Sequence, residues 1–343
     1  MLFDFLKKNK KEPQPTVEPE YPSVLPKITL VQGKEEIPEL QGDYAKTIFL
    51  WANSKSALVR KDDEYTRYML YECGIRHPSE YHERLIREGY LEKDSAEKAF
   101  MSLKVPDLKE LAIKLGTAKS GKKADLVSRI LSTADSNFLA AHQPVTYSLS
   151  EKGATFLNEH DAYVQLHRHS VWGIDWKEYD AAHISGESFY ETAIRVLKSH
   201  AAQDNRLFGR QEYLSLSQIY EEIGDKQKAL AYVLQMFYID LSGVSELDSI
   251  SYCKEGAFTK KQLLEWYEGS NPITPWVVSK LAEHAEFYSD SIVDKLYTWQ
   301  LPVQICSKTL FLKIVHSAID GKLDNEKAFG ELKSSYKRFL ARL

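Results

Sequence analysis

The chain has 343 residues, of which 43% are hydrophobic and 12% aromatic, and its formal net charge is −4. This hydrophobic content can form buried cores over most of the length, which excludes a wholly disordered protein, and the length suffices for two or three domains. The slight acidic excess argues against a protein that coats nucleic acid with its whole surface.

The three cysteines, Cys73, Cys253 and Cys306, are far apart and form no pair with metal-ligand spacing. An odd, unclustered set is typical of a reducing compartment, so we expect a cytoplasmic protein without disulfides or a zinc site. No apolar run reaches the ~18 residues of a membrane span. The sequence therefore predicts no membrane partner.

The N-terminal segment is rich in proline, glutamate and lysine. Residues 12–26 hold five of the twelve prolines, with glutamates between them. Such a composition cannot pack a core. We expect a disordered tail over residues 1–40.

Beyond this tail, helical periodicity dominates to the C-terminus, and only residues 89–92 and 145–149 have strand character. The sequence predicts a mostly α-helical fold in three parts. They are a domain over 41–165 that contains a small helical module at 101–135, a helical domain over 175–255, and a C-terminal helical segment over 260–343.

Residues 103–131, here called the basic hairpin, have the pattern of two short helices joined by a turn. Pro106 suits a first helical turn, and Gly116 suits a helix end. Ser120 or Gly121 is expected to open the second helix. The residues predicted to face inward are Leu108, Leu111, Ala112, Leu115, Ala124, Val127, Ile130 and Leu131.

The basic hairpin differs in charge from the rest of the chain. It holds seven lysines and arginines against three acidic residues, a net charge of +4, so the remaining residues carry −8. A turn of small residues at a helix N-terminus exposes backbone N–H groups where the helix dipole favours an anion. Lys122 and Lys123 follow at once, and Arg129 lies about two turns further on. This pattern predicts weak, salt-dependent and sequence-tolerant binding to phosphates.

The same stretch resembles a SAP module, the small scaffold-attachment motif of chromatin and DNA-repair proteins. The resemblance rests on Leu108, Leu111, Leu115, Gly116, Gly121, Lys123, Leu126 and Arg129. It implies that the hairpin binds duplex DNA, with a preference for A·T-rich tracts. The residues expected to contact DNA are Lys114, Lys119, Ser120, Gly121, Lys122, Lys123 and Arg129. Thr117 departs from the family, which usually has leucine there. The alternative is a solvated basic hairpin that only joins two domains.

The flanking residues 63–91 and 147–157 resemble a winged helix, with the basic hairpin in the position of the wing. The second helix of such a fold enters the major groove, so His82, Arg84 and Arg87 are possible secondary nucleic-acid contacts. The neighbouring Glu80, Glu83 and Glu88 have the wrong charge for phosphates. Winged helices also serve as protein-interaction modules.

Residues 211–241 resemble one tetratricopeptide-type helical hairpin, with a Gly-Asp turn at 224–225 and Ala229 at the close approach. The chain has no clear second copy, and a solenoid needs about three units. Simple α-helical packing explains the same residues equally well. The segment after residue 260 stays helical and ends in an amphipathic helix over 326–343.

No sequence motif for catalysis or nucleotide binding is present. The best metal candidates are His160, Asp161, His167 and His169, but their spacing matches no zinc or iron motif. We therefore expect no metal and no cofactor.

Together these patterns predict a non-enzymatic, cytoplasmic DNA-binding adaptor, such as a bacterial or phage accessory protein, whose helical C-terminal half binds an unknown protein partner or dimerises. One alternative is a protein-interaction scaffold without DNA binding, in which the hairpin contacts an acidic protein. Another is an accessory nucleic-acid-processing enzyme.

Overall fold

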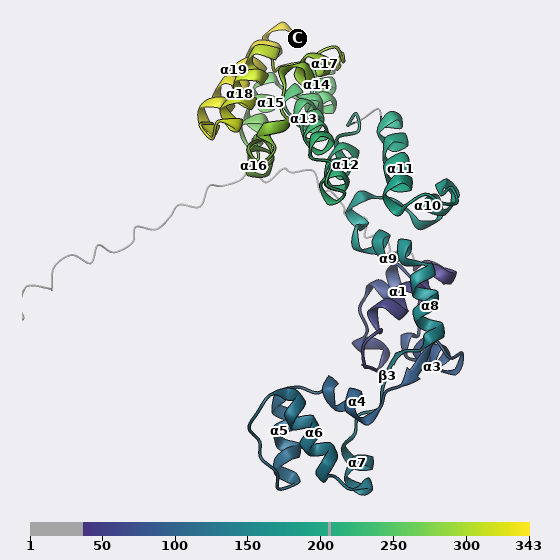
Figure 1. The fold of residues 1–343 in the computed structure, drawn as a ribbon. Helices are drawn as coiled ribbons and strands as arrows, with labels where there is room; N and C mark the ends of the chain where they lie inside the picture. Colours follow the sequence, from purple (N-terminus) through teal and green to yellow (C-terminus); the bar gives the residue numbers. More distant parts are fainter. Residues whose placement is uncertain (1–36, 205–206) are drawn as a thin grey trace, which may run out of the picture.

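The computed structural model describes residues 37–204 and 207–343, and these residues are mostly α-helical with one small β-sheet (Figure 1). The predicted fold class is thereby confirmed. The predicted tail over residues 1–40 lies almost entirely outside the described residues.

The N-terminal unit, residues 42–93 and 146–159, packs helices around the sheet. Its strands are antiparallel in the order β1-β3-β2, with Ala57 opposite Tyr147 and Leu91 opposite Leu149. The elements are α1 (Gly42–Ala52), β1 (Ala57–Leu58), a 3-10 turn (Asp62–Glu64), α2 (Tyr68–Tyr71), α3 (Pro78–Arg87), β2 (Leu91–Lys93), β3 (Thr146–Leu149) and α8 (Glu151–Glu159).

The two predicted strands are confirmed as β2 and β3, but the prediction of only two strands is wrong. β1 has two residues, too few to show an alternating pattern, and it is a strand only because β3 pairs with it. Beneath the sheet, Ile48 and Phe49 of α1 and Leu85 of α3 are fully buried in one apolar core.

The basic hairpin lies in an insertion between β2 and β3. Its elements are α4 (Ala96–Ser102), α5 (Val105–Lys114), α6 (Lys123–Thr133) and α7 (Ser136–His142). Seven buried side chains form a separate core in this insertion: Phe100, Leu108, Leu111, Ala112, Leu126, Val127 and Ile130.

Asp94 joins the two ends of the insertion to the sheet. Its carboxylate accepts hydrogen bonds from Thr146 Oγ1 at 2.8 Å and Ser148 Oγ at 2.6 Å, and its backbone N–H donates to the Thr146 carbonyl at 2.9 Å. Burial disfavours the charged carboxylate, but these hydrogen bonds outweigh burial and lower the pKa of Asp94. The chain thus leaves and re-enters the sheet at one fixed point.

The middle of the chain is a series of packed helices, in which α12 lies against both α11 and α13. The turn between α12 and α13 contains Gly224 with φ +83°, and Asp225 caps α13 by accepting from the Lys228 N–H at 3.0 Å. The predicted helical pair is present; its assignment to the tetratricopeptide type stays a prediction. The elements are α9 (Asp161–Arg168), a 3-10 turn (Ser170–Trp172), α10 (Trp176–Ala182), α11 (Phe189–Gln203), α12 (Arg210–Glu222) and α13 (Lys226–Ser242).

The C-terminal helices pack directly on α13. Phe237 of α13 shares one core with Leu281, Phe311 and Leu332 of three later helices, so packing is continuous across residues 255–260. The domain boundaries themselves stay predictions. The elements are a 3-10 turn (Val244–Glu246), α14 (Leu247–Lys254), α15 (Lys260–Glu268), α16 (Pro275–Glu283), a 3-10 turn (Ala285–Phe287), α17 (Asp290–Leu296), α18 (Lys308–Ile319) and α19 (Asn325–Arg342).

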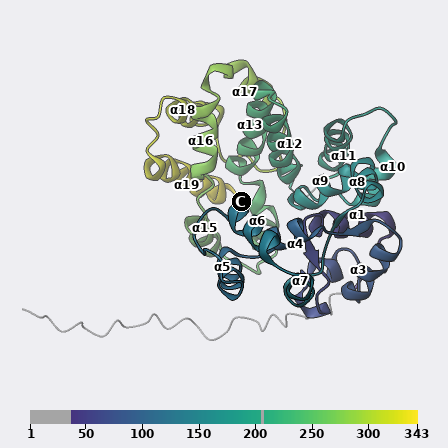
Figure 2. The same ribbon diagram turned by 60° about the horizontal axis from the view of Figure 1, so that its bottom comes forward.

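The molecule is elongated in the view of Figure 1, with α5 and α6 at one end and α18 and α19 at the other. Figure 2 shows α4 to α7 as a lobe that projects beside α1 and α3. Among the described helices, none combines the length and the apolar character needed to cross a bilayer.

Candidate nucleic-acid interface

The first helix of the basic hairpin, α5, is held by its apolar side. Leu108 and Ala112 are fully buried and Leu111 nearly so, in the same core as Leu126 and Ile130 of α6. This is the stripe that the spacing predicts. A core built by two helices that are adjacent in sequence needs few contacts with the rest of the chain.

A glycine and a threonine end α5. Gly116 has φ +69°, and its N–H donates to the Ile113 carbonyl at 2.9 Å, while the Thr117 N–H donates to the Ala112 carbonyl at 2.9 Å. These two bonds form a Schellman motif. The hydroxyl of Thr117 also donates to the Ala112 carbonyl at 3.2 Å, a polar contact in place of the apolar packing of the family's usual leucine.

The second helix begins at Lys123, and the prediction that Ser120 or Gly121 opens it is wrong. Gly121 has φ +115°, which is outside the helical region. The Asp125 carboxylate accepts from the Lys122 N–H at 3.0 Å, as expected for an acidic residue at the third helical position. Ser120 and Gly121 therefore belong to the turn.

Four of the predicted contact residues lie at one end of the hairpin. Lys114 ends α5, Lys119 lies in the turn, and Lys122 and Lys123 begin α6. Lys123 is half-buried and the other three are exposed. Within the described part of the chain, no carboxylate lies within 4.0 Å of any of the four ammonium groups. Their charges are therefore available to an external anion.

The positions of Lys122 and Lys123 are unfavourable for α6 itself. Lysines at a helix N-terminus oppose the macrodipole, at a cost of roughly 0.3–1 kcal/mol each when exposed. Asp125 in the first turn offsets part of this cost. A phosphate bound at this end of α6 would offset the repulsion between the lysines and the helix dipole, because both the ammonium groups and the dipole attract it.

Arg129 contacts the turn of the hairpin, and its predicted contact with DNA stays a prediction. Its guanidinium donates to the Ser120 carbonyl, and its Nη2 would lie 3.4 Å from a Cβ added at Gly121. The side chain thus braces the turn that carries Lys119 and Lys122. We assign it a positioning role, because the carbonyl of Ser120 already occupies part of its hydrogen-bonding capacity.

Helix α3 does not offer the three predicted contacts together. His82 is fully buried, so the prediction that it contacts nucleic acid is wrong. Arg84 lies 3.6 Å from a carboxylate oxygen of Glu88, and Arg87 lies 3.7 Å from one of Glu83. These ion pairs reduce the positive charge of the helix, and DNA contact by the two arginines stays a prediction.

His82 forms part of the N-terminal core. The Tyr65 hydroxyl is 2.8 Å from Nδ1 of His82, within hydrogen-bond distance, and accepts from the Arg60 N–H at 3.1 Å. Nε2 of His82 is buried without a hydrogen-bond partner. Burial, helped by the nearby Arg60, lowers the pKa of His82 to about 4.

We expect acid to destabilise the N-terminal unit through His82. Because the unfolded chain binds a proton near pH 6.5 and the folded chain only near pH 4, stability contributed by neutral His82 is complete above pH 6.5 and falls as the pH drops toward 4. The loss at pH 5 should be about 2 kcal/mol. Urea unfolding at pH 7 and pH 5 measures it, and His82→Gln should show a smaller pH difference. An equal difference in both proteins would contradict the assignment.

The candidate metal ligands of the sequence do not converge. His160 Nδ1 contacts the Phe156 carbonyl at 2.9 Å, His167 Nδ1 contacts Glu72 at 2.8 Å, and His169 stacks on Trp172 at 4.0 Å between ring centres. Each histidine thus contacts a different residue of the N-terminal or middle part of the chain.

Another group, Glu221, Glu283 and His284, has ligand atoms close together. Glu221 also contacts the ammonium groups of Lys226 and Lys280. Burial raises the pKa of Glu221. Hydrogen bonds from Lys226, His284 and Lys280 lower it and outweigh burial, so the pKa of Glu221 is about 2. Two ammonium groups beside the carboxylate occupy the position that a cation would need.

The prediction of contact residues omitted three side chains on or beside α5. Lys104 and Lys109 are exposed and, among described residues, pair with no carboxylate, and Ile113 is 58% exposed. The two lysines were visible in the charge count of the hairpin. Ile113 lies about 140° around the helix from Leu108, outside the predicted inward stripe, so helical spacing already placed it on the exposed side.

Comparison with protein families supports the local assignment. The family model described as SAP domain matches residues 99–133, which contain α5, the turn and α6. The searches of curated proteins and of solved structures found no match. Residues 99–133 are therefore a SAP domain, which is a DNA-binding module at the general level.

Proposed function

We propose that this chain binds the phosphate backbone of duplex DNA through its SAP domain. The observation that carries the proposal is the group of four lysines at the end of the hairpin where α6 begins, Lys114, Lys119, Lys122 and Lys123, which pair with no carboxylate of residues 37–204 and 207–343. Ser120 and Gly121 form the turn between them, and Arg129 holds that turn. Two of the lysines oppose the dipole of their own helix, so phosphate binding accounts for positions that folding does not favour.

The chemistry of the site favours backbone contacts over base readout. Ammonium groups bind phosphates as point charges and release condensed counterions from DNA. Four such contacts correspond to a slope of about −3 to −4 in log K against log salt. The resemblance to SAP modules supports a preference for A·T-rich duplexes, whose narrow minor groove concentrates negative potential.

We further propose that the N-terminal unit is a winged-helix-like platform for the hairpin. The proposal is supported by the sheet order β1-β3-β2, by the helices α1 to α3 before β2, and by the insertion of the hairpin between β2 and β3. The ion pairs on α3 favour protein contact over DNA contact for this platform.

We also propose that the chain is a non-enzymatic, cytoplasmic adaptor whose remaining helices bind a protein partner. Large apolar side chains on α14 and α15, Tyr252 and Trp266, are 51% and 46% exposed. Exposed aromatic residues of this size are frequent in protein interfaces. Once DNA binding is established, interaction experiments can identify the partner.

The variant Lys122→Glu/Lys123→Glu tests the proposal. We expect it to weaken binding to duplex DNA by about tenfold or more at low salt and to reduce the salt slope by about 2, because two phosphate contacts are lost. Fluorescence anisotropy with a labelled duplex at several salt concentrations measures both effects. The variant should stay folded, since glutamate is favourable at a helix N-terminus.

Lys254→Glu/Lys260→Glu is the matched control, because both lysines are exposed, lie in or beside α14 and α15, and change the net charge equally. It should bind DNA nearly as the unmodified chain does. Equal binding by the hairpin variant and the unmodified chain would contradict the proposal. Binding to an acidic protein that added DNA fails to displace would instead favour the scaffold function.

A further inference from the structure

Residues of α18, α19 and the loop between them line a groove. In the view of Figure 1 these two helices lie at the end of the molecule opposite the basic hairpin. Two adjoining cavities form the groove, and they share Leu310, Lys313, Lys327 and Glu331. The inner cavity has a volume of about 190 Å³, which is smaller than the roughly 300–1,000 Å³ of sites for drug-sized ligands. A group the size of a phosphate can enter it, and the outer cavity, with a volume of about 660 Å³, is larger.

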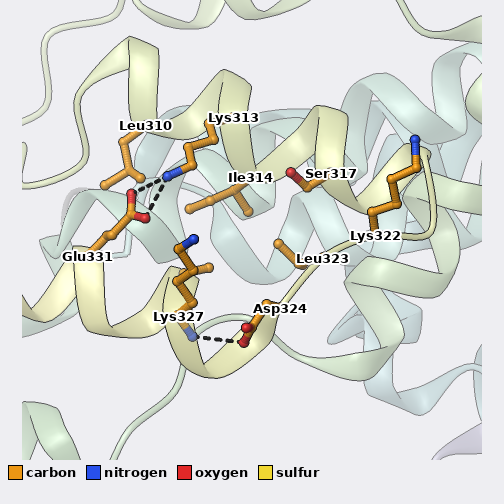
Figure 3. Close-up of a pocket in the computed structure, with 10 residues that line it drawn as sticks. Leu310, Lys313, Ile314, Ser317, Lys322, Leu323, Asp324, Lys327 and Glu331 are labelled. Atoms are coloured by element: carbon orange, nitrogen blue, oxygen red, sulfur yellow. Dashed lines mark hydrogen bonds and ion pairs between the residues drawn. The ribbon is translucent and has the colours of Figure 1, made fainter.

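The walls of the groove are cationic and rich in hydroxyl groups. Figure 3 shows Lys313, Lys322 and Lys327 around the inner cavity, with Ser317 between them. The outer cavity adds three serines, Thr309 and Arg338. Lysine, arginine and serine are the side chains that most often contact nucleic-acid phosphates.

The two acidic residues of the groove are already engaged. Asp324 accepts from the Lys327 backbone N–H at 3.0 Å as the cap of α19, and Glu331 contacts the Lys313 ammonium at 2.6 and 2.8 Å (Figure 3). Among the described residues, no carboxylate lies within 4.0 Å of the charged groups of Lys327 and Arg338. These two cations are exposed and available to an external anion.

Lys327 and Arg338 lie on one face of α19. They are three helical turns apart, a rise of about 16 Å, which corresponds to about five phosphates along one DNA strand. Between them, Gly330 has no atom within 4 Å of the place of a Cβ, and Ser334 lines the same cavity. A polyanionic chain could therefore approach the helix along the whole interval.

The charge distribution of the chain supports the same conclusion. Residues 307–343 hold eight lysines and arginines against four acidic residues, a net charge of +4 that equals the charge of the basic hairpin. The rest of the chain then carries −12, since the total is −4. The positive charge of residues 307–343 is local to α18 and α19, since residues 244–306, with nine acidic residues against five lysines, carry −4.

We infer that the α18–α19 groove is a second phosphate-binding surface, which takes the sugar-phosphate backbone of duplex DNA. This inference rests on the proposed function of the SAP domain and adds a second contact to it. Two sites on one chain raise the overall affinity, because binding at the first site increases the effective DNA concentration at the second.

The test uses the full chain and a long labelled duplex. Lys327→Glu/Arg338→Glu should weaken binding about tenfold at low salt and reduce the salt slope by about 2. The hairpin variant Lys122→Glu/Lys123→Glu should keep a residual, salt-dependent affinity. The quadruple variant, which combines these two substitutions with Lys327→Glu/Arg338→Glu, should lose it. Lys327→Gln/Arg338→Gln repeats the measurement without new negative charge, and Lys254→Glu/Lys260→Glu is the control.

The outcomes separate the two hypotheses. If the groove variants bind as the unmodified chain does, and the quadruple variant binds as the hairpin variant does, the inference is wrong and the proposed function stands. If the hairpin variant alone has no effect, the proposed function fails while the groove is still tested by its own variants. Groove variants that lose binding to phosphatidylserine vesicles but not to DNA would also overturn the inference.

Discussion

Replacing Leu126 with alanine should unfold the basic hairpin, remove its DNA binding, and leave the N-terminal unit folded. Leu126 is fully buried in a core of seven side chains that is separate from the core of the N-terminal unit. A buried leucine-to-alanine change costs about 2–5 kcal/mol. The free energy of unfolding of so small a core is itself only a few kcal/mol, so a loss of this size is enough to unfold it. We expect the affinity to fall at least about tenfold, in proportion to the folded fraction.

Hydrogen exchange measured by mass spectrometry checks the first part of this prediction, and anisotropy titration checks the second. Protection should be lost over residues 99–133 and retained over residues 42–93. Ile113→Ala is the control for hydrogen exchange, since Ile113 belongs to α5 but is 58% exposed. Loss of protection in both regions would mean that the hairpin does not unfold by itself. Unchanged DNA affinity after loss of protection over 99–133 would mean that binding does not need the folded hairpin.

Gly153→Ala should strongly destabilise the N-terminal unit. Gly153 lies in the first turn of α8, and a Cβ there would be 2.1 Å from the Tyr90 carbonyl oxygen and 3.1 Å from Leu149. The same turn is attached to the end of α3, because Ser150 Oγ donates to the Gly89 carbonyl at 2.6 Å and the Ser150 N–H donates to the Tyr90 carbonyl at 3.1 Å. The added methyl group must displace backbone, so we expect a loss of about 3 kcal/mol.

Gly330→Ala is the matched control for this change, with the opposite sign. Gly330 lies inside α19 with open space around its missing Cβ. Alanine there should raise stability by about 0.5–1 kcal/mol, because glycine loses more conformational freedom in a helix. Thermal unfolding compares the two variants. A Gly153→Ala protein as stable as the unmodified chain would show that α8 is not seated against the Tyr90 carbonyl.

The SAP domain could be recognised from the sequence because its determinants are local. The apolar stripe that includes Leu108 and Leu111, the glycine that ends α5, and the lysines that follow the turn all lie within about thirty residues. Helical spacing places such residues on one side or at one end of a helix without reference to the rest of the fold. The mostly α-helical fold was predictable for the same reason.

The errors arose where distant residues decide the structure. The two-residue strand β1 exists because β3 lies beside it, and His82 is buried because Tyr65 and the sheet cover α3. Within the hairpin, the interaction of Arg129 with the Ser120 carbonyl depends on the path of the turn. A helical pattern gives the side of a helix on which a residue lies, but not what covers that side.

Composition and local periodicity were therefore sufficient to predict the helical class, the SAP hairpin and the concentration of positive charge in it. Which cations pair with no carboxylate among the described residues, and what they lie beside, depends on the tertiary structure. Lys327 and Arg338 resemble ordinary solvated residues in the sequence. Their joint position in the α18–α19 groove follows from the packing of two helices, in which Glu331 pairs with Lys313 and Asp324 accepts from the Lys327 backbone N–H. Contacts across a helix interface depend on three-dimensional packing, which a one-dimensional pattern does not specify.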